Sequence, residues 1–335
     1  MKLYRKRAFY GLLKAFIYKK LMIFYVRKLS NLKLDDLAPI VLFVYNRPDH
    51  TKQTVEALQK NELAIDSELF IYSDAAKNET AEQKVNEVRQ YIKNIDGFKK
   101  VTLVEREKNW GLANSIIDGV TKIVNEYGKI IVLEDDLVTS PYFLKFMNEA
   151  LEVYKDEEKV WHISGYSQPF DKTGLSGHFF VKPTTCWGWS TWANRWSFFK
   201  KDIELYLCKF DENIKYDFNV KNTYPYYSHI LMNKEKKIST WAIFWYATVY
   251  FNNGLSLHPI NSMVTNIGHD GSGVHCGESC FFDVKLEIFD NSNVFPKNIC
   301  LNEIANNRLA YYYKSLKKPF FVRAINKLKK ILKGK

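Results

Sequence analysis

Three consecutive acidic residues, Glu134-Asp135-Asp136, directly follow an apolar run, Ile130-Ile131-Val132-Leu133. Neighbouring carboxylates repel one another, so a protein holds them together where a cation or hydrogen-bond donors share their charge. Their hard oxygens suit Mg²⁺ or Mn²⁺, cations that commonly bridge to the phosphates of a substrate. The segment therefore predicts a site for a divalent cation and a phosphorylated ligand. The alternative is a solvated strand end beside the helix that begins near Ser140-Pro141.

The acids end the fourth of several apolar, β-rich runs that alternate with helical segments. The sequence predicts strands at residues 40–45, 69–72, 101–104 and 129–133, and helices at residues 51–60, 80–95 and 112–127. This alternation predicts an α/β fold with a mostly parallel sheet flanked by helices, in which ligands bind at the carboxyl ends of the strands. Asn46-Arg47 and Ser73-Asp74 also follow strands, so we expect them near the acids. No Gly-x-Gly-x-x-Gly or phosphate-loop motif follows a strand, which argues against dinucleotide oxidoreductases and P-loop enzymes.

The net charge of +12 is distributed unevenly along the 335 residues. Residues 1–34 contain ten Lys or Arg and residues 314–335 contain nine, with no acid in either segment, whereas the remainder carries 30 basic and 37 acidic residues. This acidic body argues against a nucleic-acid partner. An apolar content of 46% and an aromatic content of 16% exclude a disordered chain.

Both basic ends have the pattern of amphipathic helices. In the first, apolar residues recur at three- and four-residue spacing: Phe9, Leu12, Leu13, Phe16 and Ile17. The apolar runs are too short to cross a bilayer, and no signal-peptide cleavage site follows them. We therefore expect residues 1–34 and 314–335 to lie on an anionic membrane surface, peripherally at the inner face of the plasma membrane. The alternative is that both helices pack on the body.

The five cysteines are few and odd in number, which fits a reducing compartment and hence a cytoplasmic location. Cys276 and Cys280 lie close in sequence to His269 and His275, but their spacing matches no common zinc module. The sequence therefore gives little support to a structural zinc site.

Four motifs stand in the order found in the nucleotide-binding half of GT-A glycosyltransferases. They are Asn46-Arg47-Pro48, Ser73-Asp74, Asn109-Trp110-Gly111-Leu112-Ala113 and Val132-Leu133-Glu134-Asp135-Asp136-Leu137, the last followed by Pro141-Tyr142-Phe143. Over about residues 38–290 the chain resembles the N-acetylglucosaminyltransferase I family and its bacterial relatives in O-antigen and capsule synthesis. We accordingly expect a membrane-surface segment (1–34), a nucleotide-sugar-binding half (35–150), a mixed acceptor-side half (151–300) and basic amphipathic C-terminal helices (301–335).

The resemblance implies a UDP-sugar donor and assigns roles to the motif residues. Asp136 would ligate Mn²⁺ (or Mg²⁺) on the donor diphosphate, and Asp135 would lie close to the donor ribose and sugar. Asp74 would contact the uracil and Arg47 the nucleotide. The other motif residues expected at the donor are Asn46, Asn109 and Glu134.

Two later segments are also expected to contact the donor. The Trp-rich segment 185–192 resembles the Gly-Trp segment beside the sugar pocket of the same family, and aromatic rings such as Trp187 and Trp189 stack well on sugar C–H surfaces. The alternative is that these rings build the core. The Gly-rich segment 266–275 resembles a loop that closes over the diphosphate, so Ser272 could reach phosphate and His275 the metal. The alternative is a surface turn.

The catalytic base is the least defined part of the predicted site. An inverting transferase needs a carboxylate that accepts the proton of the acceptor hydroxyl. The segment 237–245, where the related family carries its base, contains no acid. We expect Asp270 to serve, with Glu235 and Asp217 as alternatives, and a retaining outcome stays open.

These patterns together predict a metal-dependent glycosyltransferase. It would transfer a sugar from a UDP-sugar to a lipid-linked oligosaccharide acceptor during bacterial surface polysaccharide synthesis. One alternative is a sugar nucleotidyltransferase, which would require a Gly-rich, basic loop after the first strand, where Asn46-Arg47-Pro48-Asp49 is a poor substitute. Another is a non-enzymatic carbohydrate-binding membrane adaptor, which leaves the acid triplet without a purpose.

Overall fold

The computed structural model describes residues 36–270, 284–288 and 295–316. The chain divides into two units, Met1–Leu37 and Ala38–Lys335, and the architecture given below is that of the second unit. The predicted membrane-surface segment 1–34, the loop residues Ser272 and His275, and residues 317–335 lie outside the described residues.

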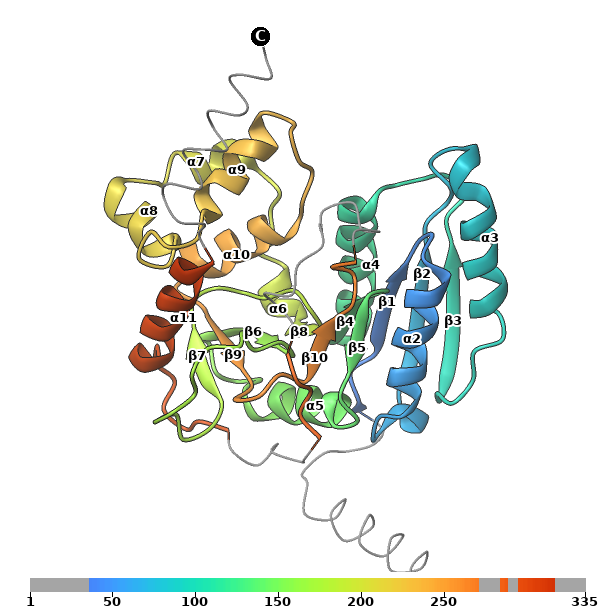
Figure 1. Cartoon of the computed structure of the whole chain (residues 1–335), viewed down its shortest axis with the longest axis horizontal. Coiled ribbons are helices and arrows are strands. Elements are labelled where there is room, and N and C mark those ends of the chain that lie inside the picture. Colours follow the sequence, from blue (N-terminus) through green and yellow to red (C-terminus); the bar gives the residue numbers. More distant parts are fainter. Residues whose placement is uncertain (1–35, 271–283, 289–294, 317–335) are drawn as a thin grey trace, which may run out of the picture. The chain divides into compact units, whose positions relative to one another are not determined.

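A sheet of eight strands, in the order β3-β2-β1-β4-β8-β6-β9-β7, runs through the described part of this unit (Figure 1). Its first four strands are mutually parallel and alternate with helices, so the expected α/β fold with a mostly parallel sheet is confirmed. The elements of this half are β1 (Ile40–Val44), α2 (Pro48–Gln59), η2 (Ala64–Asp66), β2 (Glu68–Ser73), α3 (Glu79–Ile92), β3 (Lys100–Glu105), α4 (Leu112–Tyr127) and β4 (Lys129–Glu134).

Helices cover both faces of this parallel half, which explains why β1 and β4 are continuous apolar runs. The chain moves from β1 outward to β3 and then returns to β4 on the other side of β1. Right-handed crossovers therefore place α2 and α3 on one face and α4 on the opposite face (Figure 1). The parallel register pairs Phe43 of β1 with Glu134 of β4, so the segments that follow these two strands emerge side by side.

The second half is mixed, as predicted. β8 pairs antiparallel with β4 and β6, β6 pairs parallel with β9, and β7 closes the sheet antiparallel to β9. A separate two-stranded ladder joins β5 to β10. The elements are β5 (Leu137–Thr139), α5 (Phe143–Val153), β6 (Val160–Ser164), β7 (Phe179–Val181), β8 (Trp189–Trp192), α6 (Ala193–Trp196), α7 (Ile203–Leu207), α8 (Glu212–Phe218), α9 (Tyr226–Lys234), α10 (Ala242–Phe251), β9 (Leu255–His258), β10 (Val264–Asn266) and α11 (Glu303–Ser315).

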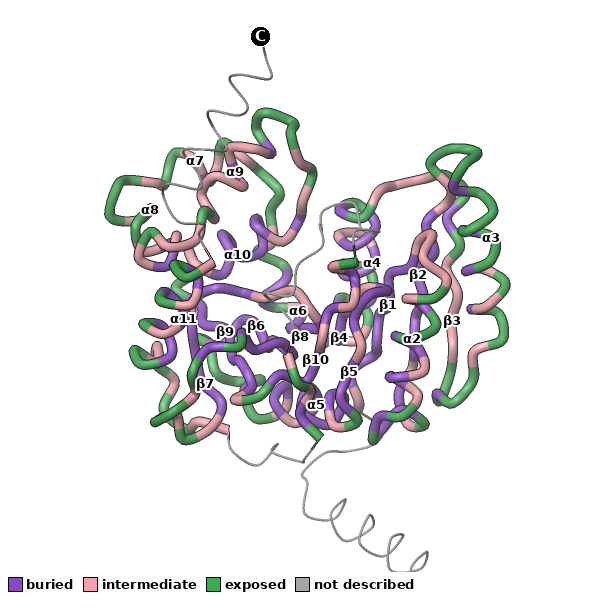
Figure 2. Tube along the Cα trace, viewed as in Figure 1, coloured by how far each residue is buried: buried purple, intermediate pink, exposed green. Residues whose placement is uncertain are grey.

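A cluster of tryptophans joins the two halves on the α4 side of the sheet. Trp189 of β8 is 1% exposed, and its ring centroid lies 5.2 Å from that of Trp241 and 5.8 Å from that of Trp196. The sequence analysis placed Trp189 at the sugar, but the structure places it in this core. Figure 2 shows the central strands of the sheet as buried.

α11 packs on the body through a buried apolar face. Ala305, Leu309 and Tyr313 join a cluster with Phe179 and Val181 of β7. The described beginning of the predicted C-terminal segment is therefore part of the folded body. Among the helices that the structure describes, none has both the length and the apolar character needed to cross a membrane.

We expect Trp189→Ala to lower the free energy of unfolding by about 3–5 kcal/mol, because it removes a large ring from the tryptophan core. Chemical denaturation measures the loss. The matched control is Tyr311→Ala, since Tyr311 is 76% exposed, and its effect should stay within about 0.5 kcal/mol. An equal effect of both substitutions would contradict the packing role of Trp189.

Candidate functional site

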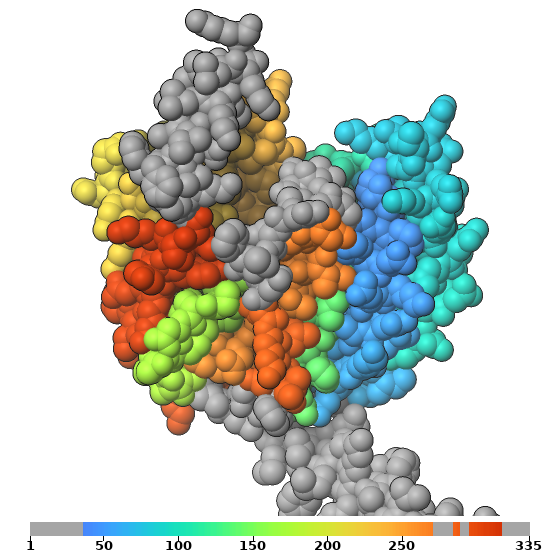
Figure 3. Space-filling view, in the orientation of Figure 1, coloured from blue at the N-terminus to red at the C-terminus, as the bar shows by residue number. Residues whose placement is uncertain are grey.

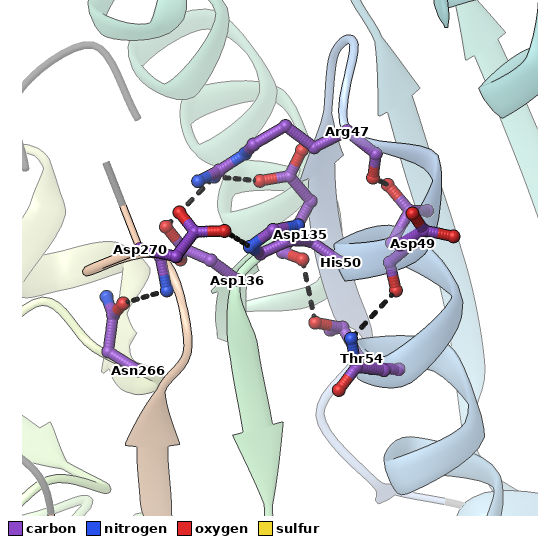
Figure 4. A network of polar contacts seen from close by, with 11 residues as sticks. Arg47, Asp49, His50, Thr54, Asp135, Asp136, Asn266 and Asp270 are labelled. Atoms are coloured by element: carbon purple, nitrogen blue, oxygen red, sulfur yellow. Dashed lines mark hydrogen bonds and ion pairs between the residues drawn. The ribbon is translucent and has the colours of Figure 1, made fainter. Parts of the chain in front are cut away.

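Arg47 and two of the three consecutive acids meet at the carboxyl end of the sheet. Arg47 follows β1, and its Nη2 donates a hydrogen bond to Asp136 Oδ2 at 2.9 Å and a second one to Asp135 Oδ1 (Figure 4). The acids end β4, the parallel neighbour of β1. The structure therefore brings together three residues that the sequence had placed at the ends of different strands.

This ion pair is shielded from solvent. Asp135 is 4% exposed and Asp136 is 7% exposed. Burial raises the pKa of Asp135 to about 6, although the charge of Arg47 opposes the rise. Burial alone would lower the pKa of Arg47, but the charges of Asp135 and Asp136 raise it above its ordinary value. The guanidinium therefore stays protonated and supplies a permanent positive charge.

The backbone around the acids is held from two sides. Thr54 of α2 donates from Oγ1 to the carbonyl of Asp135 at 2.9 Å, and the amide of Ile267 donates to the carbonyl of Asp136 at 2.9 Å. A side chain at Gly268 would overlap Asp136 Oδ2 and would lie 2.9 Å from Arg47 Nη1. Glycine at this position therefore lets the segment after β10 close over the ion pair.

Glu134 and Asp136 line a cavity of about 440 Å³, to which both halves of the sheet contribute residues. Much of the remaining wall is aromatic, and these rings belong to Tyr166, Trp187, Tyr224, Tyr226, Trp241, Tyr246 and Tyr313. Burial raises the pKa of Glu134 to about 8, and the charges of Asp136 and Asp135 act in the same direction. The cavity thus combines two carboxyl groups with several aromatic side chains, a set that suits contact with a sugar.

Trp187 lines this cavity, whereas Trp189 does not. The Trp187 ring is held edge-on by Tyr166 at 4.6 Å and by His269 at 5.4 Å between centroids. Between the two tryptophans, Gly188 has φ +60°, a left-handed conformation that turns the chain. The turn sends one ring to the cavity and the other to the core.

Asp74 has a local structural role in the described residues. Its carboxylate accepts hydrogen bonds from the amides of Ala75, Trp110 and Gly111 at 2.8–3.0 Å, which fixes the start of α4. Asn109 donates to the Ala75 carbonyl at 2.7 Å. A separate, open hollow of about 790 Å³ along α4 is lined by Asn109 and by none of the three consecutive acids. Asn46 precedes Arg47 in the same turn.

The three candidate bases lie in different surroundings. Asp270 lies two positions after Gly268, and its Oδ2 is 3.2 Å from His50 Nε2 of α2 (Figure 4). In the space-filling view the orange segment that contains β10 lies against the blue segment that contains α2 (Figure 3). Asp217 pairs with Lys182 and accepts a hydrogen bond from Tyr250. Glu235 pairs with Lys237 at the surface.

None of these three carboxylates lines the 440 Å³ cavity. Asp270 pairs with His50 and follows closely the segment at Gly268 that covers Asp136, whereas Asp217 and Glu235 belong to ion pairs elsewhere. His229 of α9, which the sequence analysis did not single out, does line the cavity, and burial lowers the pKa of its ring. The sequence analysis also missed Thr54 and the tyrosines of the cavity wall.

The carboxylate oxygens at this strand end suit a divalent cation as ligands. The described residues contain no group of three side chains that could hold a metal by themselves. Mg²⁺ typically uses one or two carboxylates and completes its shell with substrate phosphates and water. Asp136 lines the cavity and supplies such a carboxylate, so it would hold the cation together with a bound diphosphate.

A protein-family model described as glycosyl transferase family 2 matches residues 40–220, more than half of the chain. The chain belongs to glycosyl transferase family 2. The matched residues of this glycosyltransferase include all of the parallel half and the acids at the end of β4. The expectation of a glycosyltransferase is therefore confirmed, while the resemblance to the N-acetylglucosaminyltransferase I family stays a prediction.

The family 2 glycosyltransferase is also distantly similar to solved structures. The mannosyltransferase PcManGT from Pyrobaculum calidifontis, in complex with GDP-Man and Mn²⁺, is 10% identical, with 72% of this chain and 79% of that chain covered and a TM-score of 0.38. Mouse xyloside xylosyltransferase 1 is 11% identical, with 64% and 81% covered and a TM-score of 0.33. The galactosyltransferase LgtC, with donor and acceptor sugar analogues, is 10% identical, with 65% and 72% covered and a TM-score of 0.32. A search of curated protein sequences found no significant match.

We expect Glu134→Gln to weaken the pH dependence of stability. The folded pKa of Glu134 is about 8 and its ordinary value is 4.5, so the folded state binds more protons between these values. The wild type should therefore lose stability as pH rises from about 4.5 to about 8. Urea denaturation near both limits measures the loss, which should be smaller in Glu134→Gln.

The control for this comparison is Glu235→Gln, which changes an exposed carboxylate outside the cavity. It should keep the wild-type pH dependence. Identical pH dependence in wild type and Glu134→Gln would show that the buried carboxyl of Glu134 does not titrate as its surroundings predict.

Proposed function

We propose that this glycosyltransferase binds a UDP-sugar at the carboxyl ends of β1 and β4 and transfers its sugar to a saccharide acceptor in the aromatic cavity. The observation that carries the proposal is the Arg47–Asp135–Asp136 ion pair beside a cavity that Glu134 and Asp136 line. A family 2 match over these residues supports the same assignment.

The leaving diphosphate gathers negative charge as the bond to the sugar breaks. A divalent cation on Asp136 would supply Lewis-acid stabilisation of that charge. Arg47 adds a second positive charge, which Asp135 and Asp136 hold at the strand ends in the free protein. Preorganised charges of this kind act where charge develops and need no rearrangement during the reaction.

The acceptor sugar would lie against the aromatic rings of the cavity. Trp187 is the ring we propose to support it, because it lines the cavity and is held in place by Tyr166 and His269. Asp270 remains the proposed base, because its side chain is 46% exposed and it follows by two positions Gly268, which covers Asp136. Its carboxylate would accept the hydroxyl proton while the acceptor oxygen bonds to the sugar and the diphosphate departs.

We further propose that the acceptor is lipid-linked and that the enzyme works peripherally at the inner face of a bacterial plasma membrane, in surface polysaccharide synthesis. The acid-free basic segments 1–34 and 314–335 support this location, because anionic lipids attract such segments. Attachment to the membrane would raise the concentration of the enzyme near its acceptor.

We expect UDP to bind the wild type in the presence of Mn²⁺ and to lose affinity when EDTA removes the metal. Asp136→Asn should weaken binding by about 30-fold or more, since loss of one desolvated charged partner costs about 2–5 kcal/mol. Isothermal titration calorimetry measures both effects. The matched control is Asp118→Asn, which alters an arginine-paired aspartate outside the cavity.

Three results would separate the alternatives. Absence of UDP binding with metal present would refute the donor site. Release of pyrophosphate from UTP and a sugar phosphate would indicate a nucleotidyltransferase. Sugar binding that is unchanged in EDTA, without UDP binding, would indicate a carbohydrate-binding adaptor.

We expect a variant with four neutralised basic residues near the N-terminus to bind anionic vesicles more weakly. Each lost charge should cost about 1 kcal/mol of binding free energy at low salt. The substitutions to glutamine are at Lys14, Lys19, Lys20 and Arg27. Co-sedimentation with phosphatidylglycerol vesicles measures the change.

The control variant also loses four positive charges, through four lysine-to-glutamine changes on exposed parts of the body. These changes are at Lys52, Lys122, Lys155 and Lys237. Equal losses in both variants would show that overall charge, and not the N-terminal segment, determines vesicle binding.

A further inference from the structure

Arg47 occupies the position of the cation that the acids require. Its Nη2 contacts one carboxylate oxygen of Asp135 and one of Asp136. The side chain of Arg47 is 17% exposed, and those of the two acids are 6% and 11% exposed. The charge of this acid pair is thus already partly neutralised before any ligand binds.

A second cation at the same oxygen would meet steric and electrostatic resistance. Asp136 Oδ2 is covered on one side by the guanidinium and on another by the backbone at Gly268. A divalent ion bound there would lie a few ångströms from the guanidinium, and like charges at this separation repel strongly where solvent is excluded. The two cations therefore cannot both hold this oxygen at full strength.

We propose that Arg47 competes with the divalent cation for Asp136, and that a diphosphate relieves the competition by giving the guanidinium a new anionic partner. This inference rests on the proposed donor site. Arg47 lies in the turn after β1, so its side chain can leave the acid pair while the strand stays in register. Binding of the nucleotide then raises the affinity for the metal, and the reverse, through the movement of Arg47.

The proposal has a thermodynamic consequence. If UDP raises the affinity for Mn²⁺, then Mn²⁺ raises the affinity for UDP by the same factor. Part of that factor belongs to Arg47, because only a diphosphate draws the guanidinium away. Removal of Arg47 should raise the affinity for Mn²⁺ alone and reduce the coupling between the two ligands.

The experiment measures Mn²⁺ binding to the full chain by electron paramagnetic resonance of free Mn²⁺, with and without UDP. Without UDP, Arg47→Gln should bind Mn²⁺ more tightly than wild type by about 5- to 150-fold, the usual range of such couplings. The enhancement that UDP produces should shrink by a similar factor. Unchanged Mn²⁺ affinity in Arg47→Gln would overturn the competition.

Two further variants guard the result. The double variant Arg47→Gln/Asp135→Asn removes one positive and one negative charge, so the net charge of the site stays the same. It replaces the single variant if that variant does not fold. It should also bind Mn²⁺ more tightly than wild type. Arg106→Gln is the matched control, because Arg106 is 8% exposed and pairs with Asp118 away from the three acids. It should leave Mn²⁺ affinity unchanged, and a gain equal to that of Arg47→Gln would overturn the proposal.

The two proposals fail separately in this experiment. Wild type that binds UDP with Mn²⁺, but gains no Mn²⁺ affinity from Arg47→Gln, would refute the competition and keep the donor site. Tighter Mn²⁺ binding by Arg47→Gln, with no UDP binding in any variant, would support the competition and refute the nucleotide.

Discussion

Two aspartates buried side by side impose the condition on which the site depends, which is that a positive charge must lie against them. Removing one partner of a buried ion pair typically costs about 3–5 kcal/mol, because the remaining charge is left uncompensated. The parallel pairing of β1 and β4 satisfies this condition, since it delivers Arg47 to Asp135 and Asp136 from a neighbouring strand end. The sheet register and the ion pair therefore support one another.

The short ladder between β5 and β10 extends this arrangement to the far end of the chain. Residue pairs Thr265–Val138 and Asn266–Leu137 place the segment after β10 directly over the acids. The amide of Ile267 then bonds to the carbonyl of Asp136 at 2.9 Å, and Gly268 provides the room for close approach. The segment after β10, more than 120 positions from the acids in sequence, is thus held in place by β5, the strand that directly follows the acids.

The parallel half was predictable because its signals are local. Four buried strands show as apolar runs, and parallel strands bring their carboxyl ends to one edge, so Arg47 and the acids could be placed together from the sequence. The cavity wall was not predictable, because Tyr226 and Tyr313 meet only after α9 and α11 have packed. Trp187 and Trp189 are the same residue type, so the sequence does not distinguish them. The left-handed turn at Gly188 sends them in different directions, and no hydrophobic periodicity in the sequence predicts that turn.

Arg47 alone would not balance the negative charge at this strand end once a donor binds. One guanidinium bonds to two of the three carboxyl groups there, and burial, together with the charges of Asp136 and Asp135, raises the pKa of Glu134 although Arg47 opposes the rise. A nucleoside diphosphate would add further negative charge at the same edge. If Arg47 turned to the diphosphate alone, Asp135 and Asp136 would lose their counter-ion in a place that burial makes costly. A divalent cation on Asp136 would restore the balance, so the buried acids that hold Arg47 in the free protein are also the reason that donor binding should require metal.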